Sequence, residues 1–222
     1  MSVGINIEHA IKRYGSNTII PDLSLHIRPG EFFTLLGPSG CGKSTLMQIM
    51  AGILKPDGGE LCYFGKKAAY KSSTFRRFCG YVPQENPLME ELTVQDNLKL
   101  WGGSHNANTK ELVAQFQLED LLQTEVSKLS GGMKRRLSIA CALVENPPFL
   151  LMDEPTTALD LYYKESIHQW MKTYQQKNGI ILMTTHDESE IRNADRCLFM
   201  DEGKVQELDA ETILQKFSGM SG

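Results

Sequence analysis

A glycine-rich loop near the start of the chain most constrains its fold. The stretch Gly37–Ser44 reads GPSGCGKS and matches the phosphate-binding pattern GxxxxGK followed by Ser or Thr at every fixed position. The apolar run EFFTLLG at 31–37 is typical of a buried strand, and STLMQIMAGIL at 44–54 is typical of a helix. The residues expected on the buried face of that helix are Leu46, Ile49, Met50 and Ile53. Strand, loop and helix in this order predict an α/β fold that binds a nucleotide.

The residue types of this loop indicate what each contributes. Glycines let successive backbone N–H groups face a phosphate, Lys43 supplies a positive charge, and the Ser44 hydroxyl can ligate Mg²⁺. The residues expected to surround the nucleotide phosphates are Gly37, Pro38, Ser39, Gly40, Cys41, Gly42, Lys43, Ser44 and Thr45. The sequence contains no NKxD motif for reading guanine, which disfavours a GTPase.

Two further apolar runs end in polar residues. PFLLMDE at 148–154 and GIILMTTH at 179–186 are continuously apolar, as a strand covered on both faces must be. The segment 161–178 between them has a helical pattern and ends at Asn178, which suits a left-handed helix cap. Its apolar residues at helical spacing are Leu161, Ile167, Met171 and Tyr174. Alternating strands and helices support an α/β fold.

Other patterns predict an antiparallel sheet at the start, a hairpin near the end and helices between them. Residues 5–30 alternate and carry turn residues, and RCLFMDEGKVQEL at 196–208 reads as a hairpin with its turn at Asp201–Gly203. The stretch 85–145 shows no clear strand pattern and reads as helical, as an inserted subdomain would. The tail from 217 is expected to fray.

We therefore predict one domain over residues 1–222. Its core, with the β subdomain, is expected from about 1–84 and 146–216, and the helical subdomain from about 85–145.

Composition excludes several classes of protein. The net charge of −4 disfavours a nucleic-acid binder, which usually carries a basic excess. The five cysteines include no CxxC pair, and their odd number fits no closed disulfide framework, so a reduced cytosolic setting is expected. No apolar run approaches the roughly 18–20 residues that span a bilayer.

The strand ends supply candidate catalytic groups. In a P-loop fold Asp153 would lie near Ser44 and hold Mg²⁺, and Glu154 would orient or deprotonate the attacking water. Because the carboxyl ends of parallel strands gather at one sheet edge, we predict that His186 contacts phosphate there. The simpler alternative is that these polar residues only mark where strands reach solvent. On the residues alone, Gln84 in GYVPQENPL is interpreted as structural.

A second possible phosphate cradle lies at 129–133, which reads LSGGM. Ser130, Gly131 and Gly132 precede a helical pattern, and free N–H groups at a helix start can bind an anion. Serine is also a favoured helix cap without any ligand. The basic residues KRR at 134–136 are interpreted as a solvated helix face.

Together these motifs resemble the ATP-binding subunit of an ABC transporter, from about Ile5 to Phe217. They follow the family's order: an aromatic near the N-terminus, GPSGCGKST, GYVPQ, LSGGM, FLLMDE, ALD at 158–160 and TTH at 184–186. LSGGM ahead of a strand ending in DE is highly specific to this family. The resemblance implies a P-loop NTPase core with a mainly parallel central sheet, an N-terminal antiparallel β subdomain and an inserted α-helical subdomain.

The resemblance also explains the second cradle. In the family, two such domains pair head to tail, and each ATP lies between the P-loop of one and the LSGGM segment of the other. It implies that Tyr14 stacks on adenine, that Gln84 contacts Mg²⁺ or water, and that Asp160 crosses the dimer seam. Met133 departs from the glutamine that many members have.

Glu154 and His186 resemble the family's catalytic pair. The implied metal ligands are Ser44, Gln84 and Asp153. The implied cofactors are ATP and Mg²⁺.

The function implied by resemblance is ATP hydrolysis that drives transport through separate membrane permease subunits. The ATPase partner is then a second copy or a paralogue, and the chain lies on the cytoplasmic face of the membrane. SGGMKRRL is nearest to stand-alone ATPases of bacterial drug or antibiotic exporters, which favours export. LTVQDNLKLW at 92–101 lies where the family receives coupling helices of the permease.

Two alternatives remain open at this point. One is a soluble ABC-type ATPase acting on nucleic acid or ribosomes, although the sequence lacks the long coiled coils or tandem domains of such proteins. The other is a regulator that binds ATP without turnover, which the presence of Glu154 and His186 disfavours.

Overall fold

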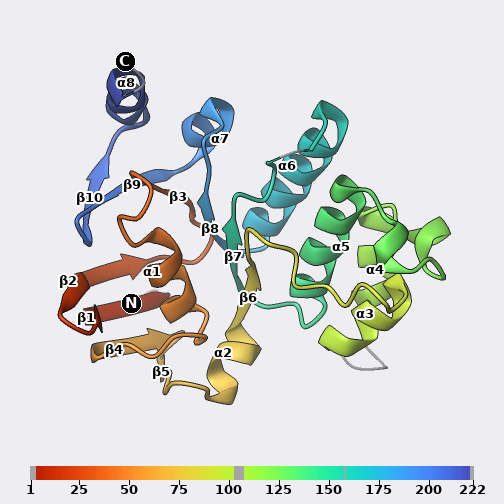
Figure 1. The fold of residues 1–222 in the computed structure, drawn as a ribbon, viewed down its shortest axis with the longest axis horizontal. Coiled ribbons are helices and arrows are strands. Elements are labelled where there is room, and N and C mark those ends of the chain that lie inside the picture. Colours follow the sequence, from red (N-terminus) through yellow and green to blue (C-terminus); the bar gives the residue numbers. More distant parts are fainter. Residues whose placement is uncertain (1–3, 103–107, 158, 221–222) are drawn as a thin grey trace.

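Two sheets organise the chain in the computed structural model, which describes residues 4–102, 108–157 and 159–220 (Figure 1). Ala158 of the ALD motif lies outside the described residues. The smaller sheet has the order β2-β1-β4-β5 and the larger has the order β10-β9-β3-β8-β7-β6. The strands of the smaller sheet are β1 (Ile5–Tyr14), β2 (Asn17–Ile27), β4 (Gly58–Tyr63) and β5 (Lys66–Lys67). The strands of the larger sheet are β3 (Phe32–Leu36), β6 (Cys79–Val82), β7 (Phe149–Asp153), β8 (Ile180–Thr184), β9 (Arg196–Asp201) and β10 (Lys204–Leu208).

Helices connect these strands. The α-helices are α1 (Lys43–Met50), α2 (Ser73–Phe78), α3 (Val94–Gly102), α4 (Asn108–Gln115), α5 (Gly131–Leu143), α6 (Leu161–Gln176), α7 (Glu188–Asn193) and α8 (Ala210–Met220). Two 3₁₀ turns, η1 (Glu119–Leu121) and η2 (Val126–Lys128), lie between α4 and α5. Among the described residues, no helix has the length and apolar character needed to cross a bilayer.

The larger sheet is parallel except at its β10 edge. β3 pairs in parallel with β8 and β9, and β7 pairs in parallel with β6 and β8, whereas β10 runs antiparallel to β9. Every residue of β3, β7 and β8 is buried, which explains their continuous apolar sequences. The prediction of a P-loop core with a mainly parallel sheet and an antiparallel β sheet at the N-terminus is confirmed.

Alternate residues of the central strands face two separate clusters of buried side chains. Phe33 and Leu151 pack with α1 and the smaller sheet, so that α1 is held between the two sheets. Leu150 and Met183 point to the other face and pack with α5 and α6. Burial on both faces fixes the register of each strand, because a slip by one residue would exchange the two faces.

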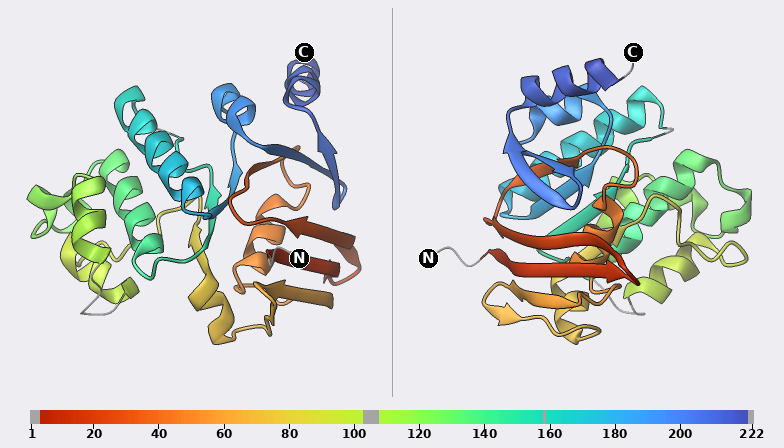
Figure 2. Two further views of the ribbon diagram at one scale, coloured as in Figure 1. Left: turned by 180° about the vertical axis from the view of Figure 1, so that it is seen from behind. Right: turned by 60° about the vertical axis from the view of Figure 1, so that its left-hand side comes forward.

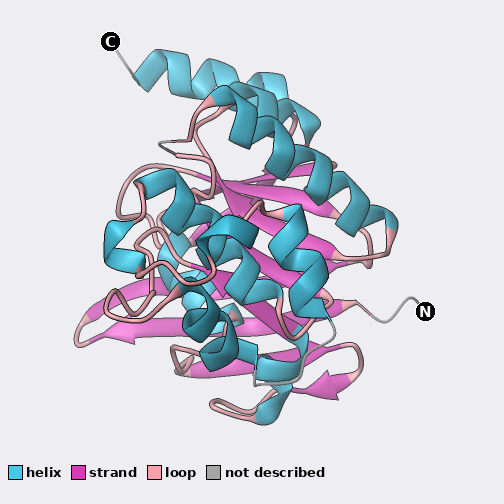
Figure 3. Cartoon of the chain, turned by 90° about the vertical axis from the view of Figure 1, so that its right-hand side faces the viewer, coloured by secondary structure: helices cyan, strands magenta, loops and turns pink. Residues whose placement is uncertain are grey.

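Helices α3, α4 and α5 gather at one end of the molecule, and the smaller sheet lies at the other (Figures 1 and 2). Figure 3 is seen from the side of these helices and shows them in front of the strands. Between Pro83 and Ser130, the described residues form helices, 3₁₀ turns and loops, with a single isolated bridge between Thr93 and Glu125.

Several sequence predictions fail at the ends of elements. Helix α1 stops at Met50 because Gly52 turns the chain with a φ of +72°, and this leaves Ile53 outside the helix and 55% exposed. Leu161, in the first turn of α6, is 75% exposed. The tail expected to fray begins at 217; its residues 217–220 form the end of α8, and 221–222 lie outside the described residues.

Three short strands escape prediction altogether. β4 begins with Gly58 and Gly59, and β5 has only two residues, so neither shows an alternating pattern long enough to read. β6 also spans only four residues. Their pairing with β1, β4 and β7 holds them in the sheets, and the pairings of β4 with β1 and of β6 with β7 join residues far apart in sequence.

Candidate functional site

The phosphate loop leaves the buried strand β3 and enters α1. Gly37 has a φ of +147°, and a Cβ atom there would lie 2.1 Å from the carbonyl oxygen of Met200 in β9, so only glycine fits. Gly42 caps α1 with a φ of +111° and forms no side-chain cap bond. The first N–H groups of α1 thus lack a capping side chain, which suits them to bind an anion.

Lys43 closes the loop from inside. Its Nζ donates hydrogen bonds to the carbonyl oxygens of Gly37 at 2.7 Å and of Pro38 at 2.9 Å. The ammonium group is therefore held beside the glycine turn, where a phosphate would meet both its charge and the free N–H groups. The loop fits a nucleotide phosphate, as the sequence predicts.

Asp153 connects the phosphate loop to the ends of two central strands. Its Oδ2 accepts a hydrogen bond from Ser44 Oγ at 3.3 Å, and its Oδ1 accepts one from Thr184 Oγ1 at 2.5 Å. A hydroxyl and a carboxylate at this separation are hard oxygen ligands of the kind that Mg²⁺ prefers. Ser44 and Asp153 therefore fit a magnesium ion.

Glu154 and His186 meet at the same edge. Glu154 Oε1 lies 3.3 Å from His186 Nε2, and Glu154 Oε2 accepts a hydrogen bond from Thr157 Oγ1 at 3.2 Å. The His186 side chain is 63% exposed, and its ring packs edge-on against Phe217 with centroids 6.1 Å apart. The structure thus places the two predicted catalytic residues in contact, with the histidine open to solvent.

The backbone of Glu154 is held in an unusual conformation. Its φ is +46°, in the left-handed region that non-glycine residues rarely adopt. Its N–H group donates to the carbonyl oxygen and to the hydroxyl of Thr184, at 3.2 and 3.0 Å. Backbone strain of this kind persists only where neighbouring groups fix it, and it concentrates at functional sites.

Asp187 follows His186 and begins α7. Its Oδ1 accepts hydrogen bonds from the N–H and the hydroxyl of Ser189, and its Oδ2 accepts one from Lys164 Nζ at 3.1 Å. The Ser189 hydroxyl bond and the Lys164 ammonium lower the pKa of Asp187 to about 2. Asp187 therefore remains ionised at neutral pH and fixes the backbone beside His186.

The LSGGM segment forms an open helix start, separate from the phosphate loop. Ser130 caps α5 by accepting a hydrogen bond from the Met133 N–H at 3.3 Å. A Cβ atom built on Gly131 would meet no atom within 4 Å, so this turn faces open space. No hydrogen bond among the described residues joins Ser130 to the phosphate loop.

The remaining predicted site residues lie elsewhere on the surface. Tyr14 ends β1 with an exposed ring, and the Lys12 ammonium lies 5.3 Å from its centroid. Gln84 lies exposed in the loop after β6, and Asp160 caps α6 through the Tyr163 N–H at 3.1 Å. Within the described chain no hydrogen bond joins these residues to Ser44 or Asp153. Their roles remain predictions.

The interpretation of KRR as a solvated helix face is wrong for two of its three residues. Arg135 and Arg136 are buried, whereas Lys134 forms an ion pair with Glu90 at 2.6 Å. Each buried guanidinium donates to backbone carbonyl groups from another part of the chain. Nothing in the local sequence reveals these acceptors, because carbonyl groups have no sequence signature.

A family model described as "ABC transporter" matches residues 20–157, more than half of the chain. The chain is 36% identical over 220 residues to the sulfate/thiosulfate import ATP-binding protein of Xanthomonas campestris, covering 93% of this chain and 64% of that protein. It is also 36% identical over 209 residues to the Nod factor export ATP-binding protein I of Rhizobium etli, with 90% and 66% covered. The chain spans just under two thirds of the length of these relatives.

A solved structure gives the same result. The fold superposes on a dimeric bacterial ABC transporter cassette with a TM-score of 0.83 and 29% identity, over 93% of this chain and 98% of that one. The phosphate loop, the paired Glu154 and His186 and the open LSGGM helix start thus occur in a fold shared with a known cassette. The chain belongs to the ABC transporter family and carries its ATP-binding cassette.

Proposed function

We propose that this chain hydrolyses ATP to drive an ABC transporter. The observation that carries the proposal is the meeting of Ser44, Asp153, Glu154 and His186 at the carboxyl edge of β7 and β8, beside the phosphate loop. A magnesium ion held by Ser44 and Asp153 would neutralise charge on the phosphate oxygens.

In this proposal each side chain has a task. Lys43 exchanges its bonds to loop carbonyl groups for bonds to phosphate oxygens. The Glu154 carboxylate accepts a proton from the attacking water, and His186 orients that carboxylate through its Nε2 while its exposed ring reaches the phosphate. A positioned base of this kind typically contributes about 10²–10⁴-fold to the rate.

A second chain completes the site in our proposal. The open helix start at Ser130–Gly132 has free donors for a nucleotide held elsewhere, and a single phosphate loop leaves the γ-phosphate available to them. Next to Asp160, the side chains of Leu161 and Tyr162 are exposed, which supports a surface covered by another protein. The similar cassette described above is dimeric. We infer a head-to-tail pair of identical or paralogous chains.

A membrane subunit has a suitable docking surface between the core and the helical end. An apolar groove of about 440 Å³ lies between the end of α1, β6, the loop after β6 and α5. The residues that line it include Ile53, Tyr81, Pro87, Trp101 and Cys141. We propose that residues 85–145 form the helical subdomain and that a short helix of a permease subunit occupies this groove.

The proposed location follows from that partner, whereas the direction of transport is a separate prediction. The chain would lie on the cytoplasmic face of the membrane, bound to the permease. The relatives named above include one import and one export protein. Export remains our prediction from SGGMKRRL, and ATP-driven accumulation of drug-like compounds in inside-out vesicles tests it.

The first experiment compares Glu154→Gln with the wild type. We expect ATP turnover to fall by about 100-fold or more, ATP affinity to be unchanged, and light scattering to show a dimer only when ATP is present. The matched control is Glu119→Gln, an exposed carboxylate in η1 that should behave as wild type. Turnover in Glu154→Gln equal to wild type would remove Glu154 from the base role. A variant that stays monomeric with ATP, even when the permease is present, would contradict the dimer.

A further inference from the structure

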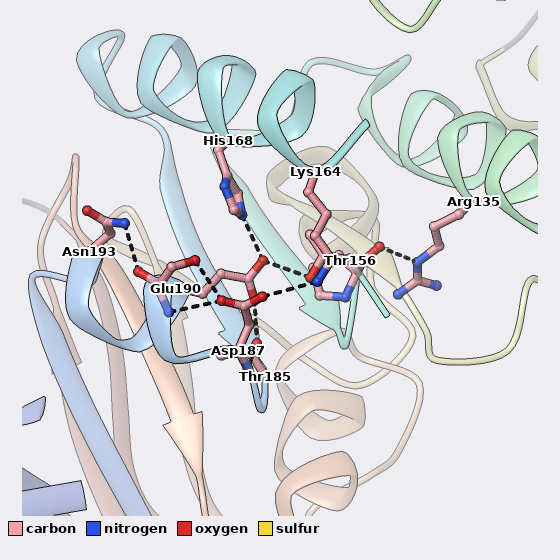
Figure 4. A network of polar contacts seen from close by, with 10 residues as sticks. Arg135, Thr156, Lys164, His168, Thr185, Asp187, Glu190 and Asn193 are labelled. Atoms are coloured by element: carbon pink, nitrogen blue, oxygen red, sulfur yellow. Dashed lines mark hydrogen bonds and ion pairs between the residues drawn. The ribbon is translucent and has the colours of Figure 1, made fainter. Parts of the chain in front are cut away.

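One buried arginine connects three parts of the candidate site. Arg135, in the second turn of α5, is 5% exposed. Its Nη2 donates to the carbonyl oxygen of Asp153 at 2.5 Å, and its Nε donates to that of Pro155 at 2.9 Å. Its Nη1 donates to the carbonyl oxygen of Pro83 at 2.5 Å and lies 3.4 Å from that of Gln84. Figure 4 shows the guanidinium reaching from α5 toward this backbone.

These acceptors flank Glu154. The carbonyl groups of the residues immediately before and after it accept hydrogen bonds from Nη2 and Nε, which lie along one edge of the rigid guanidinium plane. Glu154 itself has the left-handed φ of +46°, a conformation that needs support from its surroundings. Arg135 supplies that support on one side, and Thr184 supplies it on the other.

The charge of Arg135 is also maintained. Burial lowers its pKa to about 10, and the nearby carboxylates of Asp153 and Glu154 oppose that shift. The guanidinium therefore stays protonated at neutral pH. Each hydrogen bond that it donates goes to a main-chain carbonyl oxygen. Among the described residues no ion pair involves Arg135, so its directed hydrogen bonds are its main contribution.

We propose that Arg135 is a positioning residue that fixes the backbone of Glu154 and ties it both to the LSGGM helix and to the loop that carries Gln84. The proposal rests on the proposed function of Glu154 as the base. A ligand on Ser130–Gly132 engages the start of α5, and a partner on the Gln84 loop shifts Pro83. Both events act on the same guanidinium, so each biases the orientation of Glu154 in its own chain.

The test replaces the guanidinium by an ammonium group. Arg135→Lys keeps the charge but loses the planar fork, so it cannot hold Asp153 and Pro155 together with Pro83. We expect kcat to fall by about 10- to 100-fold, because a base displaced by about 1 Å loses that much. ATP affinity, measured with a fluorescent nucleotide, should change by less than about twofold, since the phosphate loop is untouched.

The neighbouring Arg136 is a matched control. It is also buried, donates to the carbonyl oxygens of Phe116 and Gln117, and lies 4.0 Å from the ring centroid of Tyr163, with bonding partners other than those of Arg135. Arg136→Lys should lower the unfolding temperature but leave kcat within about twofold of wild type. Equal losses of kcat in the two variants would overturn the proposal, as would wild-type kcat in Arg135→Lys. If Arg135→Lys does not fold, Arg135→Gln is compared with Arg136→Gln, since both lose the charge together with the planar fork.

A double variant separates positioning from direct chemistry. If Arg135 acts through Glu154, then Arg135→Lys combined with Glu154→Gln turns over ATP at the rate of Glu154→Gln alone. A further tenfold fall in the double variant would show that Arg135 acts elsewhere. Absence of ATP turnover in the wild type, with and without membranes, would instead overturn the proposed function itself.

Discussion

The carboxylate of Glu190 accepts a hydrogen bond from the Thr156 hydroxyl at 2.7 Å, across 34 positions of sequence. The same oxygen, Oε1, lies 2.8 Å from His168 Nε2, and Oε2 accepts a hydrogen bond from the Thr185 hydroxyl. Thr156 follows the end of β7 and Thr185 follows the end of β8 (Figure 4). One buried carboxylate thus joins the two backbone segments that carry the predicted catalytic pair.

Removing this carboxylate should destabilise the protein. Glu190 is 2% exposed, so Glu190→Ala would leave the donors on Thr156 and Thr185 without an acceptor in the interior. We expect a loss of about 2–4 kcal/mol in the free energy of unfolding, measured by urea denaturation. On the same helix, Glu188 pairs at the surface with Arg192, and Glu188→Ala should cost far less. Equal losses would contradict this account.

The cap of α7 should make stability depend on acid pH. The folded pKa of Asp187 is depressed to about 2, so its stabilising effect is present above the unfolded value of about 3.9 and is lost as pH falls toward 2. At neutral pH, Asp187→Ala should cost about 1 kcal/mol, because the carboxylate is partly hydrated and screened. Unfolding measured between pH 7 and pH 2 should show wild type and Asp187→Ala converging below pH 4.

Asp187→Asn is the control for that series. It keeps a capping oxygen for the Ser189 N–H but does not titrate, so its stability should differ from that of Asp187→Ala by an amount that does not vary with pH. A wild-type advantage that persists unchanged to pH 2 would rule out the Asp187 cap as its source.

A bulky charge at the LSGGM segment should act on the neighbouring chain. Ser130→Arg fills the open helix start, while the phosphate loop of the same chain stays intact. In mixed dimers that carry this change in one chain, we expect turnover to be lost at the phosphate loop of the other chain. Differently tagged chains, each with Lys43→Ala in turn, identify the site that still works. Loss confined to the mutated chain's own loop would exclude the head-to-tail arrangement.

The apolar groove should govern binding to membranes. Trp101 lines the groove and is partly exposed, whereas Lys43 and Glu154 do not line it. Trp101→Ser therefore changes the groove without touching the phosphate loop or the predicted base. We expect ATP affinity to stay unchanged and binding to permease-containing vesicles to fall by about tenfold or more. Tyr70→Ser, a partly exposed aromatic that does not line this groove, serves as control. Unchanged vesicle binding in Trp101→Ser would place the permease contact elsewhere.

The sequence was most informative where one residue type has one physical use. The glycines of the phosphate loop and the continuously apolar runs correctly predicted the central strands and α1. They also predicted the carboxyl edge of the sheet, where Asp153 and His186 lie. Asn178 does adopt the left-handed conformation expected of it, with a φ of +65°. These features depend on local chemistry, and they were predicted correctly.

What escaped prediction depends on contacts between distant segments. Arg135 and Glu190 carry charges that normally lie at a surface, and their burial is possible only because carbonyl and hydroxyl groups from other elements surround them. Likewise, the exposure of Leu161 follows from its place in the first turn of a capped helix. No pattern of hydrophobicity encodes such partners.

The bond from Arg135 to Pro83 has a consequence for how this family can vary. The two residues are 52 positions apart, and their contact closes the intervening stretch at its base. For a closed loop, the entropy of closure grows only with the logarithm of its length, so doubling that length would cost about 0.6 kcal/mol. Insertions or exchanges between these two positions should therefore leave the sheet intact, and an exchanged stretch could present a different surface to a different membrane protein.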